Sequence, residues 1–242
     1  MTKRFFDIAV SAVGLLLLWP FLMLFLLMIW LQDFCSPFYI APRARTRNTT
    51  FNMVKLRSMV KNADKVGGAS TATNDRRITW VGKLIRKTKF DEVPQLWNVF
   101  VGDMSLVGPR PQVIRDVALY TEEEHHLFDV RPGITDFSSI VFADEGEILK
   151  GSENPDLRYN QVIRPWKSQL GLFYARNNSV LVDVQLIVLT VMSAVSRQRA
   201  LAGVQSILRA LGAPAELVSI AGRKNVLVPR PPPGADAVET RS

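Results

Sequence analysis

The sequence contains few of the residues that form disulfide frameworks and transition-metal sites. Cysteine occurs once, at Cys35, which excludes an internal disulfide and any cysteine-rich metal site. Histidine occurs twice, at the adjacent positions His125 and His126, and this pair argues against a histidine-based zinc centre. A disulfide scaffold and a zinc enzyme are therefore the first classes to set aside.

Apolar residues, by contrast, are abundant. Of the 242 residues, 48% are hydrophobic and the mean hydropathy is +0.10, both high for a soluble domain. Residues 8–31 form a run of 24 positions without a charge, long enough to cross a bilayer as a helix. This run is too long for the core of a signal peptide and has no small-residue cleavage site, so we expect it to be retained as an anchor.

Pro20 lies near the centre of this apolar run. Proline removes a backbone hydrogen bond and kinks or breaks a helix, so the run is either a kinked span or a helix-break-helix that enters one leaflet and returns. Basic residues flank both ends of the run, at Lys3, Arg4, Arg43, Arg45, Arg47, Lys55 and Arg57. The positive-inside rule favours the re-entrant form, which keeps both flanks in the cytoplasm. The kinked span stays the alternative.

Periodicity and turn residues predict a mostly helical α+β domain after the anchor. A small β-hairpin is expected from 38–40 and 51–56, and helices are expected over 78–85, 92–100, 113–128, 157–175, 179–195 and 200–211. The polar residues 60–77 fit a connector or a lid. The proline-rich tail from Pro229 is expected to be disordered.

Three of these helical segments carry a more specific expectation. Glu122, Glu123 and Glu124 are expected to lie on a solvated face of the helix over 113–128. The aromatic and basic side chains of 157–175 fit either a membrane interface or core packing. Residues 179–195 fit a core helix at the bilayer surface better than a second span, because Asp183 inside a span would be costly.

The formal charge of +8, from 30 basic and 22 acidic residues, predicts an anionic partner such as nucleic acid, anionic lipid or a phosphorylated substrate. No nucleic-acid recognition motif occurs, and the basic residues gather around carboxylates, which repel phosphate unless a metal is bound. We therefore expect no nucleic-acid binding. A DNA mobility shift that weakens with salt would contradict this expectation.

The most unusual stretch is 86–111, where adjacent carboxylates at Asp91 and Glu92 lie among cations. Arg86, Lys87 and Lys89 precede them, and Arg110 follows between two prolines. These charges fit structural ion pairs. They also fit a site in which carboxylates bind a divalent ion or attack an electrophile while arginines hold phosphate oxygens.

Pro94 predicts where the helix after these carboxylates begins. Proline is tolerated only in the first turn of a helix, which puts the N-cap near Asp91. Because Pro94 has no N–H to donate to a capping carboxylate, the carboxylate of Asp91 would be freer for a metal or a substrate.

Three more cations are candidate phosphate ligands. Lys55 and Arg57 alternate along the second predicted strand and so share one face; a strand that faces solvent or lipid headgroups is the alternative. Arg131 precedes a turn at Pro132 and Gly133, which repeats the rigid setting of Arg110.

Three segments, 90–99, 102–111 and 130–135, follow one another at characteristic distances. With them the chain, from about Lys3 to about Ser196, resembles the bacterial sugar transferases, the monotopic polyprenyl-phosphate phosphoglycosyl transferases. The resemblance implies a re-entrant helix broken at Pro20 and a compact cytoplasmic catalytic domain with amphipathic interface helices. We therefore expect an anchor over 1–33, a phosphoglycosyl transferase domain over 34–200, and a C-terminal helix and tail over 201–242.

The resemblance also implies an activity at the cytoplasmic face of the bacterial inner membrane. A phosphosugar would pass from a UDP-sugar to polyprenyl (undecaprenyl) phosphate, with release of UMP. Asp91 would be the nucleophile of a ping-pong reaction through an aspartyl phosphosugar and would bind Mg²⁺, while Glu92 supports the site. The cations expected to meet phosphate charge are Lys55, Arg57, Arg86, Arg110 and Arg131. Membrane lipid is an expected partner, and a homo-oligomer is left open.

A catalytically inactive, membrane-tethered scaffold of the same fold is the alternative function, although the carboxylates and arginines are intact. The chain also departs from the family pattern in places. Trp19 stands where serine usually precedes the proline, Leu56 stands where phenylalanine is usual, and Ala44 and Thr46 stand where the hairpin loop usually has glycine. Residues 136–145, which would border the donor, differ too, so the sequence does not name the sugar.

Overall fold

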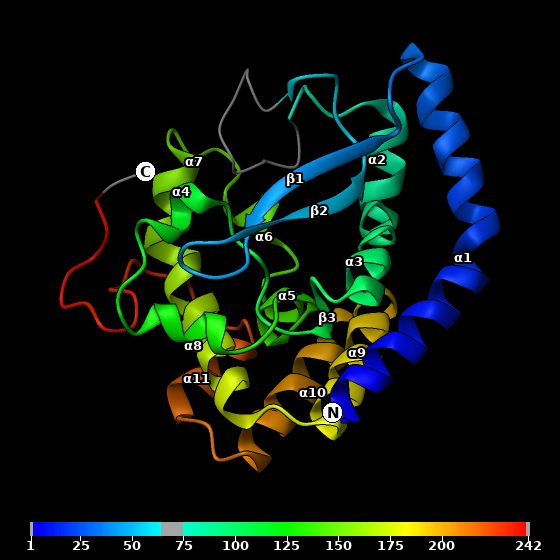
Figure 1. Cartoon of the computed structure of the whole chain (residues 1–242). Coiled ribbons are helices and arrows are strands. Elements are labelled where there is room, and N and C mark those ends of the chain that lie inside the picture. Colours follow the sequence, from blue (N-terminus) through cyan, green and yellow to red (C-terminus); the bar gives the residue numbers. More distant parts are fainter. Residues whose placement is uncertain (1, 64–74, 241–242) are drawn as a thin grey trace.

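The computed structural model describes residues 2–63 and 75–240. It is a mostly helical α+β protein with a small two-stranded sheet, as predicted (Figure 1). The helices are α1 (Thr2–Asp33), α2 (Trp80–Lys87), α3 (Gln95–Val101), α4 (Ile114–Val117), α5 (Phe137–Val141), α6 (Glu145–Ile148), α7 (Pro155–Arg158), α8 (Arg164–Asn177), α9 (Val180–Val195), α10 (Arg197–Ala210) and α11 (Ala215–Ala221). The strands are β1 (Phe38–Ala44), β2 (Thr50–Leu56), β3 (Ser105–Val107) and β4 (Gly133–Thr135). The predicted lid or connector lies mostly outside the described residues.

The predicted membrane segment is one continuous helix, α1, which begins at Thr2 and contains Pro20. The chain does not leave the helical conformation at the proline; α1 bends along its length instead (Figure 1). Among the described residues it is the one helix long and apolar enough to cross a membrane, and most of its large apolar side chains are exposed. The helix is therefore bent without a break in its helical conformation, and the choice between a re-entrant and a spanning helix stays a prediction.

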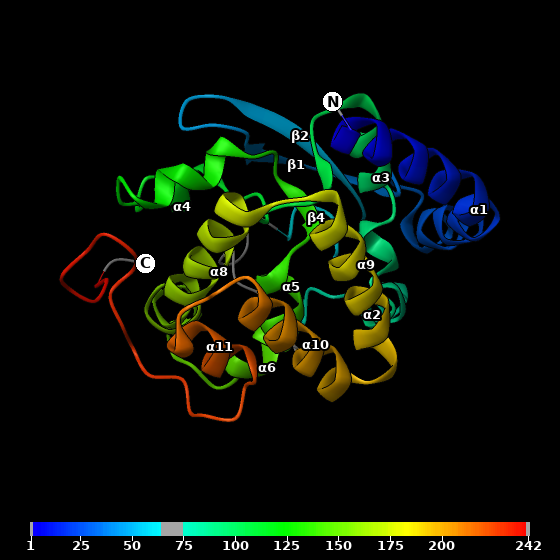
Figure 2. The same ribbon diagram turned by 90° about the horizontal axis from the view of Figure 1, so that it is seen from below.

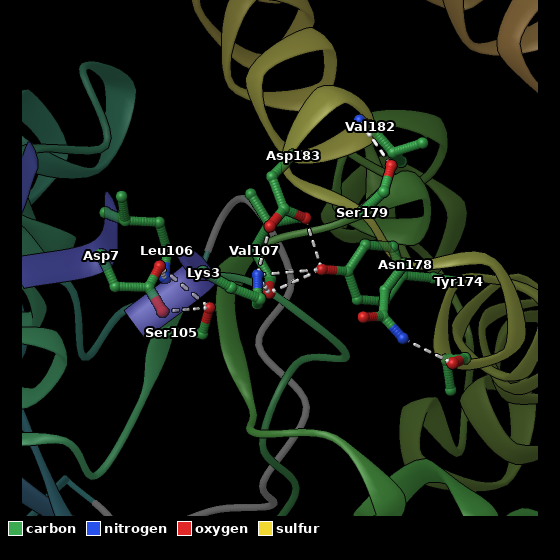
Figure 3. Close-up of polar contacts among 11 residues, drawn as sticks. Lys3, Asp7, Ser105, Leu106, Val107, Tyr174, Asn178, Ser179, Val182 and Asp183 are labelled. Atoms are coloured by element: carbon green, nitrogen blue, oxygen red, sulfur yellow. Dashed lines mark hydrogen bonds and ion pairs between the residues drawn. The ribbon is translucent and has the colours of Figure 1, made fainter. Parts of the chain in front are cut away.

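The N-terminal end of α1 is held to α8 and α9 by a buried polar cluster (Figure 3). Lys3 forms an ion pair with Asp183 of α9 and donates to the hydroxyl of Tyr174 at 3.2 Å. That hydroxyl lies 2.5 Å from the other oxygen of Asp183, which is fully buried. Burial first, and then the hydrogen bond with Asp183, raise the pKa of Tyr174. Lys3, predicted to precede the helix, thus fixes it in place.

The next residues of α1 bind β3 and α3. Arg4 donates to the carbonyl oxygens of Val99 at 2.5 Å and Phe100 at 2.7 Å, so its charge lies at the C-terminal end of α3, where the helix dipole favours a cation. Asp7, which is 1% exposed, accepts hydrogen bonds from the Ser105 hydroxyl at 2.9 Å and from the amide of Leu106 at 3.1 Å (Figure 3). One turn of α1 therefore fixes its position against two elements.

The C-terminal half of α1 packs on a second, smaller core. Leu22 and Ile29 of α1 are buried with Val81 and Ile85 of α2 and with Leu56 of β2. Phe25 and Phe90 also meet there, with ring centroids 4.8 Å apart. This core places the residue just before Asp91 against the helix expected to lie in the membrane.

The hairpin forms as predicted, although its first strand is longer. β1 and β2 pair antiparallel, from Phe38 opposite Leu56 to Ala44 opposite Thr50. Asn98 of α3 joins the hairpin to the body, because its side chain accepts from the amide of Val54 at 2.9 Å and donates to the carbonyl of Asn52 at 2.8 Å.

The segments 102–111 and 130–135 meet through the parallel pair β3–β4. Gly108 and Gly133 allow this approach: a Cβ on Gly108 would lie 2.2 Å from the carbonyl oxygen of Arg131, and one on Gly133 would lie 2.0 Å from the amide of Gly108. The pairing explains why both segments carry glycine next to proline.

The helix predicted over 113–128 is wrong. The chain forms only α4 and a 3₁₀ turn over 124–129, and Glu124 is fully buried instead of solvated. Arg164 of α8 forms an ion pair with Glu124, and Ser168 donates to it at 2.6 Å. A partner forty positions away drew this carboxylate inward, and the local pattern contains no signal of it.

The aromatic face of 157–175 packs in the core, which is the second of its two predicted roles. Trp166, Leu170 and Tyr174 are buried, and α8 lies with α9 and α10 around α5 and β4 (Figure 2). The segment is also not one regular α-helix, since a π-helical turn over 159–163 separates α7 from α8. α9 is a core helix through Asp183 and Leu186, with an exposed apolar face on its other side.

The C-terminal tail packs on the body, which differs from the expected disorder. The amide of Arg230 donates to the carbonyl of Gln161 at 3.0 Å, and its guanidinium lies 3.8 Å from the ring centre of Trp166. Pro232 and Pro233 are buried, and Thr121 donates to the carbonyl of Pro233. Proline removes backbone freedom from the unfolded chain, so this segment loses little entropy when it packs.

The buried cluster around Asp183 yields a stability prediction. Asp183→Ala removes the carboxylate that accepts from the ammonium of Lys3 and the hydroxyl of Tyr174, which keep the carbonyl of Val107 as a shared acceptor, at a cost of about 2–3 kcal/mol. We expect the melting temperature of the detergent-solubilised protein to fall by about 5–10 °C. Asp129→Asn, which touches only an exposed pair with His126, is the control and should melt like the wild type.

Candidate active site

Asp91 and Glu92 lie in a short 3₁₀ turn, Phe90–Glu92, between α2 and α3. The prediction that the N-cap of the next helix lies near Asp91 is therefore wrong, because α3 begins at Gln95 and its N-cap is Pro94. Because Pro94 has no N–H, it cannot make the i→i−4 bond to the carbonyl of Phe90, and that carbonyl instead accepts a 3₁₀ bond from the amide of Val93 at 3.1 Å. Lys89, at a positive φ of 54°, reverses the chain into the turn.

Glu92 points into a pair of cations. It forms an ion pair with Arg110 and lies 3.5 Å from the ammonium of Lys55 on β2. Burial by itself would raise the pKa of Glu92, but the charges of Arg110 and Lys55 outweigh burial and hold this pKa below its ordinary value. The same pair raises the pKa of Arg110. Glu92 is thus ionised, its carboxylate is paired with Arg110 and Lys55, and it orients Arg110.

Asp91 has a different environment. Among residues 2–63 and 75–240 its carboxylate makes no hydrogen bond or ion pair. Burial first, and then the charge of Glu92, raise the pKa of Asp91, while Lys55, Arg86 and Arg110 oppose the rise. A half-buried carboxylate without a partner is only partly solvated and stays accessible, so it is free to bind or attack an electrophile.

Two arginines beside the turn have unused donors. The Nη1 atom of Arg86, in the last turn of α2, is buried and has no hydrogen-bond partner in the described part of the chain. The same holds for the Nε atom of Arg43 on β1. Burial and then the charge of Arg110 lower the pKa of Arg43. Such unpaired guanidinium groups can bind an anion.

Sequence reasoning named Arg86 as a phosphate ligand but missed Arg43. Its position in the hairpin loop region gave no local signal, and only the folding of β1 toward Arg110 brings the two charges together. Lys89 was predicted only to lie near the two carboxylates. In the structure, desolvation by the surrounding protein lowers its pKa, although the charge of Glu92 opposes this shift.

Two predicted phosphate ligands do not join the cluster. β2 ends at Leu56, so the alternation that was to align Arg57 with Lys55 stops before Arg57. Arg57 instead binds Asp33, at the end of α1, through two hydrogen bonds of 2.5 and 2.6 Å. Arg131 has an exposed side chain, and no contact in the described residues joins it to Asp91, Glu92 or Arg110.

A cavity of about 210 Å³ opens beside the turn. Lys89, Glu92 and Arg110 line one end of it, and most of the remaining wall is apolar. Within the described residues, no group of three or more histidine, cysteine or acidic side chains could hold a metal by itself. The site therefore combines one free carboxylate, one paired carboxylate, several cations and an adjacent apolar space.

A model of the bacterial sugar transferase family matches residues 1–197. The chain belongs to this family. The match covers α1, the hairpin, the carboxylate turn and both rigid arginine segments, and it leaves α10, α11 and the tail outside.

Named relatives support the assignment. Exopolysaccharide production protein PSS of Rhizobium leguminosarum bv. phaseoli is 35% identical over 206 residues, which are 81% of this chain and 96% of that protein. The uncharacterised sugar transferase EpsL of Bacillus subtilis is 33% identical over 190 residues, 78% of this chain and 85% of the relative. The undecaprenyl-phosphate glucose phosphotransferase of Komagataeibacter xylinus is 35% identical over 198 residues, but these are only 35% of that protein. This sugar transferase thus spans about a third of some relatives and nearly all of others.

Arg110 lines the cavity, whereas Arg57 binds Asp33 at the end of α1, and this difference yields a prediction for a pair of variants. Arg110→Gln removes the cation that faces the cavity and should lower transferase activity on the order of 10²-fold. Arg57→Gln releases the end of α1 and should lower the melting temperature by about 2–5 °C, with activity of the folded protein within about threefold of the wild type. Steady-state rates and thermal melts of both variants check this, and equal losses of activity would contradict the division.

Proposed function

We propose that this sugar transferase moves a phosphosugar from a UDP-sugar to polyprenyl (undecaprenyl) phosphate and releases UMP. The observation that carries the proposal is the contrast within the turn: the carboxylate of Asp91 is half-buried and has no partner among the described residues, whereas Glu92 beside it is neutralised by Arg110 and Lys55. A nucleophile must be free and weakly solvated. Asp91 meets that requirement, and Glu92 does not.

The reaction has two steps that share one phosphorus atom. A carboxylate oxygen of Asp91 attacks the phosphorus that bears the sugar, and the bond to UMP breaks, so that UMP leaves with the electron pair. An oxygen of polyprenyl phosphate then attacks the same phosphorus, and the bond to Asp91 breaks, which restores the carboxylate. The kinetics are ping-pong, since UMP leaves before the acceptor reacts.

The cations near the turn have different roles toward the phosphates. Arg86 and Arg43 each have a buried nitrogen without a partner, which suits phosphate oxygens of the donor. Arg110 is oriented by Glu92 and stiffened by Pro109 and Pro111, so it is preorganised to meet the charge that develops at phosphorus. The arginines, and not the paired Glu92, supply the electrostatic stabilisation.

Magnesium fits this set of side chains only in part. Mg²⁺ usually binds one or two carboxylates together with substrate phosphates and keeps several waters. Asp91 provides one such carboxylate, and Glu92 is occupied by cations, so the phosphates of the donor would complete the coordination. When bound, Mg²⁺ would neutralise phosphate charge and leave the side-chain roles above unchanged.

The attachment of α1 supports a re-entrant anchor at the cytoplasmic face of the inner membrane. Its beginning is paired through Lys3 with Asp183, and its end is paired through Asp33 with Arg57. Both partners belong to the same body, which a helix crossing to the other side could not bind with both ends. The site is then held at the lipid surface, where a soluble donor and a lipid phosphate can both reach it.

Names of relatives point to the same class of substrates. One is an undecaprenyl-phosphate glucose phosphotransferase, another a UDP-N-acetylgalactosamine-undecaprenyl-phosphate N-acetylgalactosaminephosphotransferase from Aeromonas hydrophila, and a third a UDP-galactose-lipid carrier transferase from Erwinia amylovora. They carry different sugars, so the donor of this chain has to be found by assay. An inactive scaffold is disfavoured because the free carboxylate and its cations are intact.

Asp91→Asn tests the proposal. The amide cannot act as the nucleophile, so we expect UMP release to fall by at least about 10³-fold, and no labelled phosphosugar to remain on the protein after incubation with donor alone. Purified protein, a panel of UDP-sugars, undecaprenyl phosphate and Mg²⁺ provide the assay. Asp103→Asn, which changes a carboxylate that only contacts Arg45 and Asn98, is the matched control and should still form the adduct. A normally active Asp91→Asn protein would remove Asp91 as the nucleophile.

A further inference from the structure

The cavity beside Glu92 has a large wall that the chemistry at Asp91 does not use. Its charged end is formed by Lys89, Glu92 and Arg110, while Leu96 of α3 and Ile140 of α5 contribute to the apolar side. An apolar cavity of about 150 Å³ can hold benzene. At about 210 Å³, this one has room for at least one five-carbon isoprene unit.

Four hydroxyl groups also line the cavity, but none has a donor to offer a ligand. Thr190 donates to the carbonyl of Leu186 at 2.7 Å, which leaves Thr135 to donate to Thr190 across a 2.7 Å contact. Ser193 donates to the carbonyl of Thr190 at 2.7 Å. Ser139 donates to Asp136, also at 2.7 Å. Because a hydroxyl carries a single donor, this wall has no donor left for the oxygens of a sugar, although its hydroxyl oxygens can still accept. Most of the exposed lining is apolar, which suits a hydrocarbon.

The same wall lies next to the parts of the protein that are expected to meet lipid. Leu96 packs on the membrane helix, since a Cβ on Gly14 of α1 would lie 3.1 Å from its side chain. α9, which supplies Thr190 and Ser193, has an exposed apolar face on its outer side. The exposed residues of that face recur every three or four positions, at Leu181, Val184, Val188, Val191 and Val195.

We propose that this cavity binds the first isoprene unit or units of the polyprenyl phosphate acceptor. The lipid phosphate lies at the end formed by Lys89 and Arg110, beside the turn that carries Asp91, and the rest of the chain leaves along α1 and α9 into the bilayer. The identity of the acceptor rests on the proposed function. The site itself rests on the charge at one end, the satisfied hydroxyls and the contact with α1.

A cavity-filling variant separates this acceptor site from the donor site. Ser193→Trp places an indole in the cavity, whereas Ala194→Trp places the same group on the exposed neighbouring position of α9. With full-length protein in nanodiscs, we expect Ser193→Trp to raise KM for undecaprenyl phosphate roughly tenfold or more. Formation of the phosphosugar adduct from donor alone should stay within about twofold. Ala194→Trp should change neither, and equal behaviour of the two variants would overturn the assignment.

Photo-crosslinking of the wild-type protein gives a test that does not require turnover and does not depend on whether a variant folds. Wild-type protein in nanodiscs is irradiated with farnesyl phosphate that carries a diazirine on its first isoprene unit, and the labelled residues are located by mass spectrometry. We expect labels on 134–140 and 190–193 that unlabelled undecaprenyl phosphate removes and inorganic phosphate does not. Labels confined to the outer face of α9, or removed by inorganic phosphate alone, would overturn the cavity as a prenyl site. A protein that releases no UMP from any donor but labels as expected would contradict the proposed function and not this site.

Discussion

The polar contacts at the two ends of α1 are the interactions on which the rest of the structure depends. Asp183 is fully buried and is acceptable there only because Lys3 and Tyr174 satisfy it. At the other end, Asp33 is held by Arg57. These pairs fix both ends of a largely exposed apolar helix to the body, while Leu22 and Ile29 pack in the smaller core between them. They therefore set the position of α1 relative to the carboxylate turn, which also touches α1 through Phe90.

Neighbouring charges give the adjacent carboxylates of Asp91 and Glu92 different environments. Glu92 faces Arg110 and Lys55, so its charge is compensated and its pKa is low. Asp91 has no hydrogen bond or ion pair in the described part of the chain, and desolvation together with the charge of Glu92 raises its pKa. One residue of offset in a 3₁₀ turn is enough to leave one carboxylate paired and the other without a partner. The adjacent cavity continues the pattern, with cations at one end and satisfied hydroxyls and apolar groups along its wall.

Local pattern predicted those elements whose partners are near in sequence. The apolar run of α1, the hairpin and the stop of α3 at Gly102, which has a φ of 100°, follow from composition, alternation and glycine geometry. Prediction failed where a distant residue changed the balance. Glu124 is buried because Arg164 reaches it, and Arg57 leaves the expected face because the strand ends one residue earlier and Asp33 accepts its charge. The tail is ordered by Trp166 and Gln161, which no property of the tail itself indicates.

By itself the sequence determined the chemistry that is available: carboxylates among cations, rigid arginine segments and an apolar helix with a proline near its middle. These depend on residue type and short spacing, which the chain carries wherever it folds. Only the tertiary structure decided which of two adjacent carboxylates is neutralised, that Arg43 stands beside Arg110, and that a hydrocarbon-sized cavity lies between the turn and α9. Each of those outcomes requires side chains from elements far apart in the chain, and their charges and volumes balance only after packing.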